Sequence, residues 1–206
     1  LIYLKKQKYK DGWKYFDGRL NLSDFVEKNS SINKIKKKLY TKNDIDLNSN
    51  ILILREQGVG DEILYGTMYA DVFEKWKNVT IECDKRLKNL FQNSFKKYEK
   101  NFKDMGKISS SENNLEKFDH VIYAGSLGKY FRNNKSDFEK PPYLVSNQDL
   151  VNKYKIKLKN FGKKYNIGIS WRSFKNRYAN EKSLNLENIK NIFKNVECNF
   201  INLQYG

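Results

Sequence analysis

The sequence has little that would build a metal site or a disulfide framework. Its 206 residues include two cysteines, Cys83 and Cys198, with no CxxC pair and no neighbouring pair of histidines. Free cysteines of this kind are usually buried and behave as small apolar side chains. We therefore predict two buried free thiols and no metal site.

Long apolar runs are also missing. No stretch approaches the roughly 18 residues that a membrane span requires, and no charged-then-apolar signal segment opens the chain. From this we expect no membrane span and a cytoplasmic location. The chain starts at Leu1 without an initiator methionine and stops at Gly206 just after the strand-like run FINLQYG, so we interpret it as a fragment.

The composition predicts a folded chain with a strongly basic surface. Hydrophobic residues make up 39% and aromatic residues 15%, more than a disordered chain of this charge carries. A formal net charge of +16 raises the question of nucleic-acid binding. The basic residues are mostly lysines scattered along the chain, as in KIKLKNFGKKYN. We therefore favour a solvated lysine-rich surface over a functional basic face and predict no specific nucleic-acid partner.

The first stretch, from Leu1 to about Arg19, is predicted to be one amphipathic helix. Its apolar residues recur at loosely helical spacing: Leu4, Tyr9, Trp13 and Phe16. Such a helix cannot bury its apolar stripe alone, so it packs either on an upstream repeat or on the domain that follows. Residues 21–50 are polar and end in a loop.

Strand and helix patterns then alternate. ILILRE, from Ile51 to Glu56, suits a strand buried on both faces of a parallel sheet. A helical face follows, made of Ile63, Leu64, Thr67, Met68, Val72, Phe73 and Trp76. Further segments are a strand at 79–83, a helix at 85–95, a short segment at 98–102, a loop at 106–117 and a strand from 118. The alternation predicts a Rossmann-like parallel α/β sheet with helices on both faces.

A second α/β unit is predicted to begin after the PPYL segment at 141–144. The pattern is a helix at about 147–160, a strand at 165–171, a helix at 186–193 and a strand at 200–204. The sequence stops there, so this second domain is expected to be truncated.

The sharpest local motif is Gly58-Val59-Gly60-Asp61, between a buried strand and a helix. That turn lies at the carboxyl edge of a parallel sheet, where ligands bind. A dinucleotide fingerprint would need a third glycine where Ile63 stands, although Glu82 occupies the place of a ribose-binding acid. Asp61 would repel a pyrophosphate held at the helix N-terminus. It suits a general base acting on a sugar hydroxyl, or a simple helix cap.

A second motif follows the predicted strand at 165–171. Trp171 and Arg172 would place a planar ring and a bidentate phosphate-binding group at another carboxyl edge. With Arg177 and Lys182 nearby, the loop could hold a diphosphate leaving group. The alternative is a solvated basic loop beside a buried tryptophan.

Five blocks of the chain together resemble a known family. They are ILILREQGVGDEILYG, FDHVIYAGSLGKYF, PPYL, IGISWRS with KSLNLENIKNIF, and FINLQYG. Their order and spacing resemble the bacterial tetratricopeptide-repeat-linked glycosyltransferases, which are related to the lipopolysaccharide heptosyltransferases of GT-B architecture. The opening GWKYFDGRL is similar to the segment between the last repeat and the catalytic part of that family.

The resemblance implies three parts. Residues 1–48 would be the end of a helical repeat and a linker, 49–146 an acceptor-side Rossmann-like domain, and 147–206 a connecting helix and the start of the nucleotide-sugar-binding domain. It further implies an inverting, metal-independent transfer from a nucleotide-sugar donor to a saccharide or protein acceptor, with no cofactor. Protein partners would bind through upstream repeats.

The resemblance also assigns residues. Asp61 matches the catalytic base, and the acceptor-side loop holds Gln57, Gly58 and Gly60. The donor-phosphate site would be formed by Trp171, Arg172, Lys182 and Ser183. His120 is interpreted as a structural or acceptor-cleft residue. Half of the donor site would lie beyond Gly206, so we expect the isolated fragment to be inactive.

Three other classes of function stay open. The first is a non-catalytic interaction scaffold whose repeats bind partners and whose α/β domain is degenerate. The second is an NAD(P)-binding oxidoreductase. The third and weakest is a nucleic-acid binder.

Overall fold

A computed structural model describes residues 2–22, 45–162, 165–173, 180–194 and 196–204. The chain divides into two compact units, Leu1–Ser146 and Asn147–Gly206. Each unit is described by itself below.

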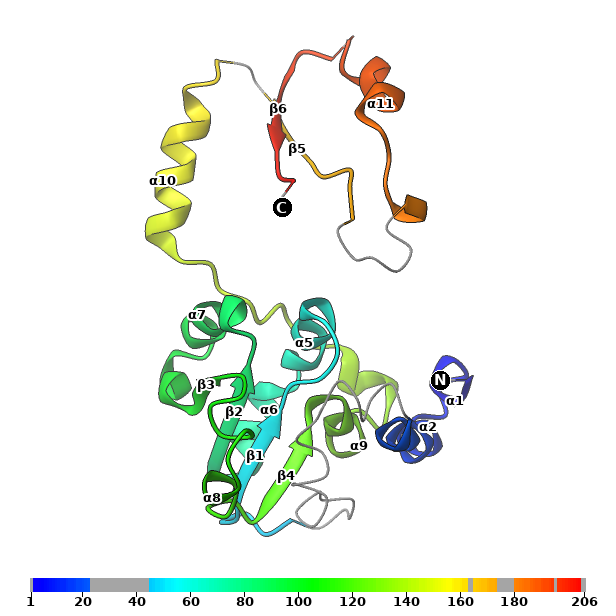
Figure 1. Cartoon of the computed structure of the whole chain (residues 1–206), viewed down its shortest axis with the longest axis vertical. Coiled ribbons are helices and arrows are strands. Elements are labelled where there is room, and N and C mark those ends of the chain that lie inside the picture. Colours follow the sequence, from blue (N-terminus) through cyan, green and yellow to red (C-terminus); the bar gives the residue numbers. More distant parts are fainter. Residues whose placement is uncertain (1, 23–44, 163–164, 174–179, 195, 205–206) are drawn as a thin grey trace. The chain divides into compact units, whose positions relative to one another are not determined.

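The first unit is built on a four-stranded parallel sheet (Figure 1). Its strands are β1 (Asn50–Leu54), β2 (Asn78–Cys83), β3 (Phe102–Asp104) and β4 (His120–Tyr123). They are hydrogen-bonded in the order β3-β2-β1-β4, all parallel, with Leu54 of β1 in register with Glu82 and Tyr123. The predicted parallel α/β sheet is therefore confirmed, including the predicted strand at 79–83.

Helices flank this sheet. In chain order the helical segments after β1 are α5 (Val59–Gly66), α6 (Tyr69–Lys75), α7 (Lys85–Ser94), η2 (Lys96–Asn101), α8 (Glu112–Leu115), η3 (Ala124–Leu127), α9 (Gly128–Phe131) and η4 (Lys135–Phe138). The prediction of a plain loop at 106–117 is wrong at α8. The predicted segment at 98–102 is the end of η2 followed by the first residue of β3.

The single helix predicted across residues 63–76 is also wrong, because α5 and α6 are separate. Tyr143 packs against Gly66, where a Cβ would lie 2.5 Å from the tyrosine oxygen, and its hydroxyl donates to the carbonyl of Ile63 at 2.6 Å. The carbonyl of Thr67 accepts from the Arg132 guanidinium at 2.8 Å instead of continuing a helix. The change of direction leaves Leu64, predicted to face the core, 63% exposed.

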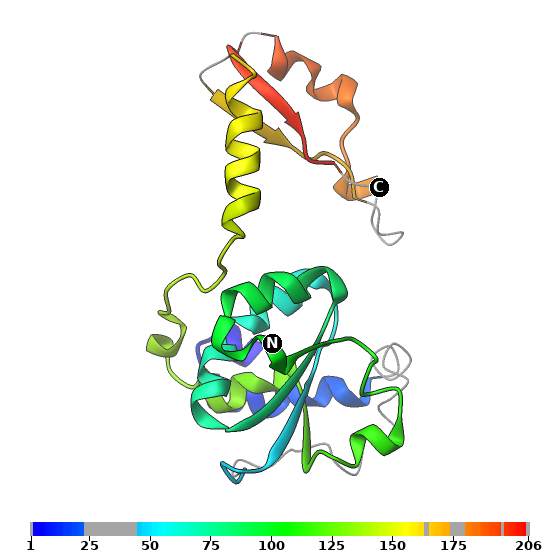
Figure 2. The same ribbon diagram turned by 90° about the vertical axis from the view of Figure 1, so that its left-hand side faces the viewer.

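Two apolar clusters lie on the two faces of the sheet, because side chains alternate along each strand. Ile51 and Ile53 belong to the larger cluster, with aromatic residues from α5, α6 and α7. Leu52 and Leu54 belong to the smaller cluster, which Leu115 of α8 helps to close. Figure 2 shows the strands and the surrounding helices from the side.

The N-terminal segment forms α1 (Ile2–Lys5), α2 (Tyr9–Phe16) and η1 (Asp17–Asn21). The single helix predicted from Leu1 to Arg19 is wrong, since Gln7 breaks it with a φ of 58°. Trp13 of α2 packs against Gly128 of α9, and its indole nitrogen donates to the carbonyl of Arg132 at 2.6 Å. Of the two packing partners predicted for this segment, α2 therefore packs against the domain that follows it in the sequence.

The second unit contains α10 (Gln148–Lys159), β5 (Tyr165–Ile169), η5 (Asn180–Lys182), α11 (Leu186–Phe193) and β6 (Cys198–Asn202). β5 and β6 are parallel, with Ile167 opposite Phe200. The limits of α11 agree with the prediction, whereas β6 begins at Cys198 rather than at Phe200. The rings of Phe193 and Phe200 meet edge to face, 4.6 Å apart, and join α11 to β6. Among the described residues of either unit, none of the helices is both long and apolar enough to cross a membrane.

Candidate functional site

The candidate site lies at the carboxyl edge of the first sheet, where the strand order changes direction. β2 and β3 lie on one side of β1, and β4 lies on the other. In open α/β sheets, ligands bind outside the carboxyl ends of the strands at such a switch point. The loop after β1 leads into α5 here, and η3 follows β4 directly.

The predicted acceptor-side loop is at this edge. Gln57, the first of its residues, has a φ of 62°, a left-handed conformation that is uncommon for a residue other than glycine. Gly58 precedes α5 as its N-cap. A Cβ built on Gly60 would meet no atom within 4 Å, so the backbone of the first turn faces open space.

Asp61 lies in the first turn of α5, as predicted. Its Oδ2 accepts a hydrogen bond from the backbone N–H of Gly58 at 3.0 Å, so the carboxylate does cap its own helix. No described residue donates to Oδ1 of Asp61. The structure thus contains the capping contact and leaves one oxygen of the same group for another partner.

A buried charged cluster that was not predicted from the sequence lies at the switch point. Glu56, directly beyond β1, is 1% exposed. Arg19 binds it with two parallel contacts, Nε to Oε2 at 2.8 Å and the second terminal nitrogen to Oε1 at 2.6 Å. The backbone N–H of Gly125, in η3 just after β4, donates to Oε1 as well. Both oxygens of Glu56 are therefore occupied.

Further polar contacts extend this cluster away from the sheet. Arg19 also contacts Asp17 at 3.0 Å and the Ser126 hydroxyl at 3.0 Å. Asp17 in turn binds the ammonium of Lys129 at 2.9 Å. Burial lowers the pKa of Arg19, but the hydrogen bond and charge of Glu56 outweigh it, so the pKa is raised overall. The signal in the sequence was Glu56, a charged residue just after a buried strand.

A second charged cluster joins the ends of β1 and β2. Glu62 of α5 is fully buried, and its Oε2 lies 2.7 Å from Nε of Arg55 as an ion pair without hydrogen-bond geometry. Its Oε1 accepts the backbone N–H of Asp84 at 2.8 Å. Burial raises the pKa of Glu62 against the opposing effects of these two partners. The hydrogen bonds from Arg86 hold the pKa of Asp84 well below its usual range.

Glu82 is not placed to bind a ribose. The side chain is 1% exposed and accepts the backbone N–H groups of Ile108 at 2.5 Å and Ser109 at 3.0 Å, together with the Ser109 hydroxyl at 2.7 Å. A carboxylate saturated by the loop after β3 has no capacity for a ribose hydroxyl. The interpretation of Glu82 as an acid at the ribose position is therefore wrong.

His120 is the first residue of β4 and lies opposite Ile51. It is therefore at the amino end of its strand, on the edge of the sheet away from Asp61. The acceptor-cleft interpretation of His120 is inconsistent with this position.

The predicted donor loop belongs to the second unit, where the side chain of Gln204 forms hydrogen bonds with its backbone. The Gln204 side-chain oxygen accepts the backbone N–H groups of Trp171 at 3.1 Å and Arg172 at 2.8 Å. Its amide nitrogen donates to the carbonyl of Arg172 at 3.1 Å. One glutamine after β6 thus fixes the loop after β5, and the Arg172 side chain is exposed.

Ser183 and Lys182 lie beside this loop. The Ser183 hydroxyl accepts the backbone N–H of Ser173 at 3.0 Å, and the N–H of Leu184 donates to the carbonyl of Trp171 at 2.9 Å. Lys182 ends η5 with an exposed side chain. The four predicted donor residues are therefore neighbours in one unit, whereas Arg177 lies outside the described residues.

Comparison with known proteins finds a distant relative. The chain is 23% identical over 168 residues to Protein FlbA of Caulobacter vibrioides, an alignment that covers 76% of this chain and 28% of FlbA. The chain therefore spans less than a third of the length of this relative. No protein-family model and no solved structure matches the chain.

Proposed function

We propose that the gene product carrying this chain is a glycosyltransferase related to the heptosyltransferases of GT-B architecture. It transfers a sugar from a nucleotide-sugar donor to a saccharide or protein acceptor. The acceptor binds at the carboxyl edge of the first unit, and the donor diphosphate binds at the loop after β5 in the second.

The observation that carries this proposal is the position of Asp61. It lies in the first turn of a helix at the carboxyl edge of a parallel sheet, with one oxygen without a partner among the described residues. The neighbouring Gly60 faces open space. A carboxylate positioned in this way can take a proton from a hydroxyl group brought to the edge of the sheet.

The chemistry is an inverting displacement. The acceptor oxygen forms a bond to the anomeric carbon while the bond from that carbon to the diphosphate oxygen breaks, and the hydroxyl proton passes to Asp61. Arg172 and Lys182 offset the charge of the departing nucleotide diphosphate, and no metal is required by this scheme. The hydrogen bonds from Trp171 and Arg172 to the Gln204 side chain fix the backbone of this loop, which positions Arg172 for contact with the diphosphate.

The capping contact of Asp61 favours the alternative of a non-catalytic scaffold, in which the residue only ends a helix. Asp61→Asn separates the two roles. An asparagine can still accept the Gly58 N–H and cap α5, but it cannot take a proton. A positioned general base contributes about 10²–10⁴-fold in rate, so we expect that loss in turnover with little change in melting temperature.

Asp137 supplies the matched control. It accepts the backbone N–H groups of Asn133 and Asn134, both at 2.8 Å, at the same position of the short helix η4. Asp137→Asn therefore makes the same chemical change at the cap of another helix, outside the loop that carries Asp61. We expect no effect on turnover from this variant.

The assay is release of nucleotide diphosphate from a panel of nucleotide sugars by the full-length gene product. Wild-type turnover in Asp61→Asn would assign Asp61 to capping and reject the mechanism. Absence of turnover for the wild-type protein across the panel would favour the scaffold.

A further inference from the structure

A hollow of about 820 Å³ lies on the first unit, away from the loop that carries Asp61. It is lined by residues of α2 and η1, by the last residue of α6, and by α9 with the turn after it. This volume is typical of a pocket for a small molecule. The proposed transfer reaction makes no use of it.

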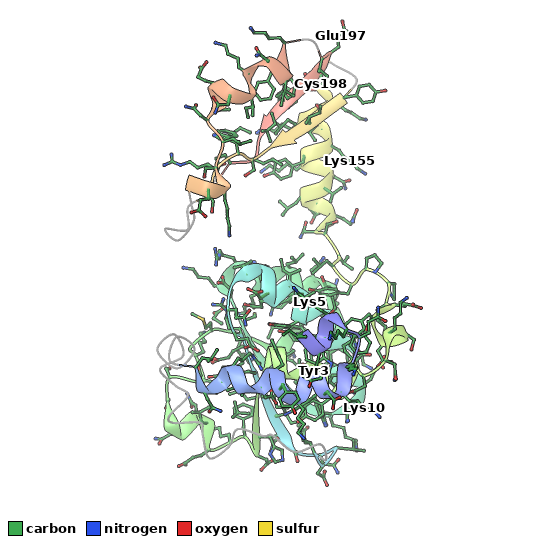
Figure 3. The ribbon with its side chains drawn as sticks, turned by 90° about the vertical axis from the view of Figure 1, so that its right-hand side faces the viewer. Tyr3, Lys5, Lys10, Lys155, Glu197 and Cys198 are labelled. Carbon is green, nitrogen blue, oxygen red and sulfur yellow. The ribbon has the colours of Figure 1, made fainter. Side chains whose placement is uncertain are left out.

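Lysines dominate the lining of this hollow. Half of its eight lining residues are lysines, Lys10, Lys14, Lys75 and Lys129, whereas lysine and arginine together make up 40 of the 206 residues of the chain. Lys10 and Lys14 are one helical turn apart on α2, and so project from the same face. Figure 3 labels Lys10 on this helix.

Only one of the four lysines that line the hollow forms an ion pair with another described residue. Lys129 is paired with Asp17 at 2.9 Å, and Asp17 is shared with Arg19 at 3.0 Å. Within the described residues, Lys10, Lys14 and Lys75 have no ion pair. The lining contributes one further carboxylate, Asp11. Three ammonium groups therefore face one carboxylate in a concave site, which concentrates the positive potential.

Aromatic rings hold the third of these lysines in place. The Lys75 ammonium lies 5.5 Å from the ring centres of both Trp76 and Tyr130, and 5.8 Å from that of Phe131. Cation–π contacts of this kind orient an ammonium without neutralising its charge. Tyr130 itself lines the hollow, so a ligand meets an aromatic surface beside the cationic groups.

We propose that this hollow binds a phosphorylated small molecule. Lys10, Lys14 and Lys75 contact the phosphate group, and Tyr130 contacts the rest of the ligand. A phosphate carries between one and two negative charges near neutral pH and accepts several hydrogen bonds, which matches three lysines that line one hollow. This site is independent of the proposed transferase reaction and uses none of its residues.

The test is calorimetric binding of pyrophosphate, AMP and glucose 6-phosphate to the 206-residue chain at two salt concentrations. We expect saturable binding with one site per chain, weakened by salt. Because a charge-assisted contact to phosphate is among the stronger hydrogen bonds, Lys14→Gln and Lys75→Gln should each lower the affinity roughly tenfold. A melting curve of each variant verifies that it is folded.

Lys97→Gln is the matched control, because the Lys97 ammonium also lies over a ring, 5.2 Å from that of Tyr98, and is not part of the hollow. It should leave the affinity unchanged. An equal loss in Lys97→Gln, or binding without saturation, would indicate general attraction to a basic surface and overturn the proposal. So would the absence of binding. A loss in Arg172→Gln but not in Lys75→Gln would move the phosphate to the donor loop and likewise reject this site.

Discussion

Removing Arg19 should destabilise the first unit far more than removing an ordinary surface lysine. The side chain of Arg19 is 9% exposed and that of its partner Glu56 is fully buried. Arg19→Met keeps much of the apolar stem and removes the charge. Among the residues that the structure describes, Glu56 would then retain only the Gly125 N–H as a donor.

The expected size follows from this burial. Breaking a buried ion pair by removing one partner costs about 3–5 kcal/mol, since the other charge is left uncompensated. Glu56→Gln should cost about 1–3 kcal/mol, because the amide can still accept from Gly125 and Arg19 keeps Asp17. The double variant should cost less than the sum of the two, with a coupling of about 0.5–3 kcal/mol.

Urea unfolding followed by tryptophan fluorescence measures these effects. The chain has three tryptophans; Trp13 and Trp76 belong to the first unit and Trp171 to the second. A Trp171→Phe background therefore restricts the signal to the first unit. Lys107→Met is the control, because Lys107 is 68% exposed and 3.9 Å from Asp104, and should cost about 0.2–1 kcal/mol. Equal costs for Arg19→Met and Lys107→Met would refute the reasoning.

Two further predictions concern glycine and cysteine. In the same urea assay, Gly60→Ala should keep the stability or raise it by about 0.4–1 kcal/mol, because the position is helical and faces open space. Gly128→Ala should cost about 1–3 kcal/mol, since its Cβ would lie 2.5 Å from the ring of Trp13; the reverse order would contradict both assignments. Burial raises the pKa of the Cys83 thiol to about 12, so the native chain should resist iodoacetamide at Cys83 at pH 8. The neutral thiol contributes to the free energy of unfolding, and this contribution should be fully present below about pH 9 and be lost as the pH rises to about 12. Peptide mass mapping after labelling, and melting curves against pH, measure these two effects; rapid native labelling would show that the thiol is accessible.

The sheet of the first unit could be predicted because its strands are coded locally. A short apolar run rich in isoleucine, such as Ile51–Leu54, with a polar loop before it, is typical of a buried parallel strand. The break between α5 and α6 could not be predicted, because it depends on Tyr143 and Arg132. These residues lie more than 60 positions away in the sequence, and the apolar spacing between residues 63 and 76 carries no trace of them.

In the candidate site too, features formed by adjacent residues could be predicted, whereas contacts between distant residues could not. The position of Asp61 followed from a strand, two glycines and a helix that are adjacent in the sequence. The pairing of Arg19 with Glu56, and the hydrogen bond between Arg172 and Gln204, join residues 37 and 32 positions apart. A single sequence shows that these residues are charged or polar but not which of them meet.

The carboxylates at the carboxyl edge differ in how completely their own protein occupies them. Arg19 and Gly125 take both oxygens of Glu56, and the loop after β3 takes both oxygens of Glu82. Arg86 binds both oxygens of Asp84. Asp61 has a single donor, on one oxygen, within the described part of the chain. A base must accept a proton from outside the protein, and among these four groups Asp61 alone retains an oxygen for one, which is why Asp61→Asn is the variant that most directly tests the proposed mechanism.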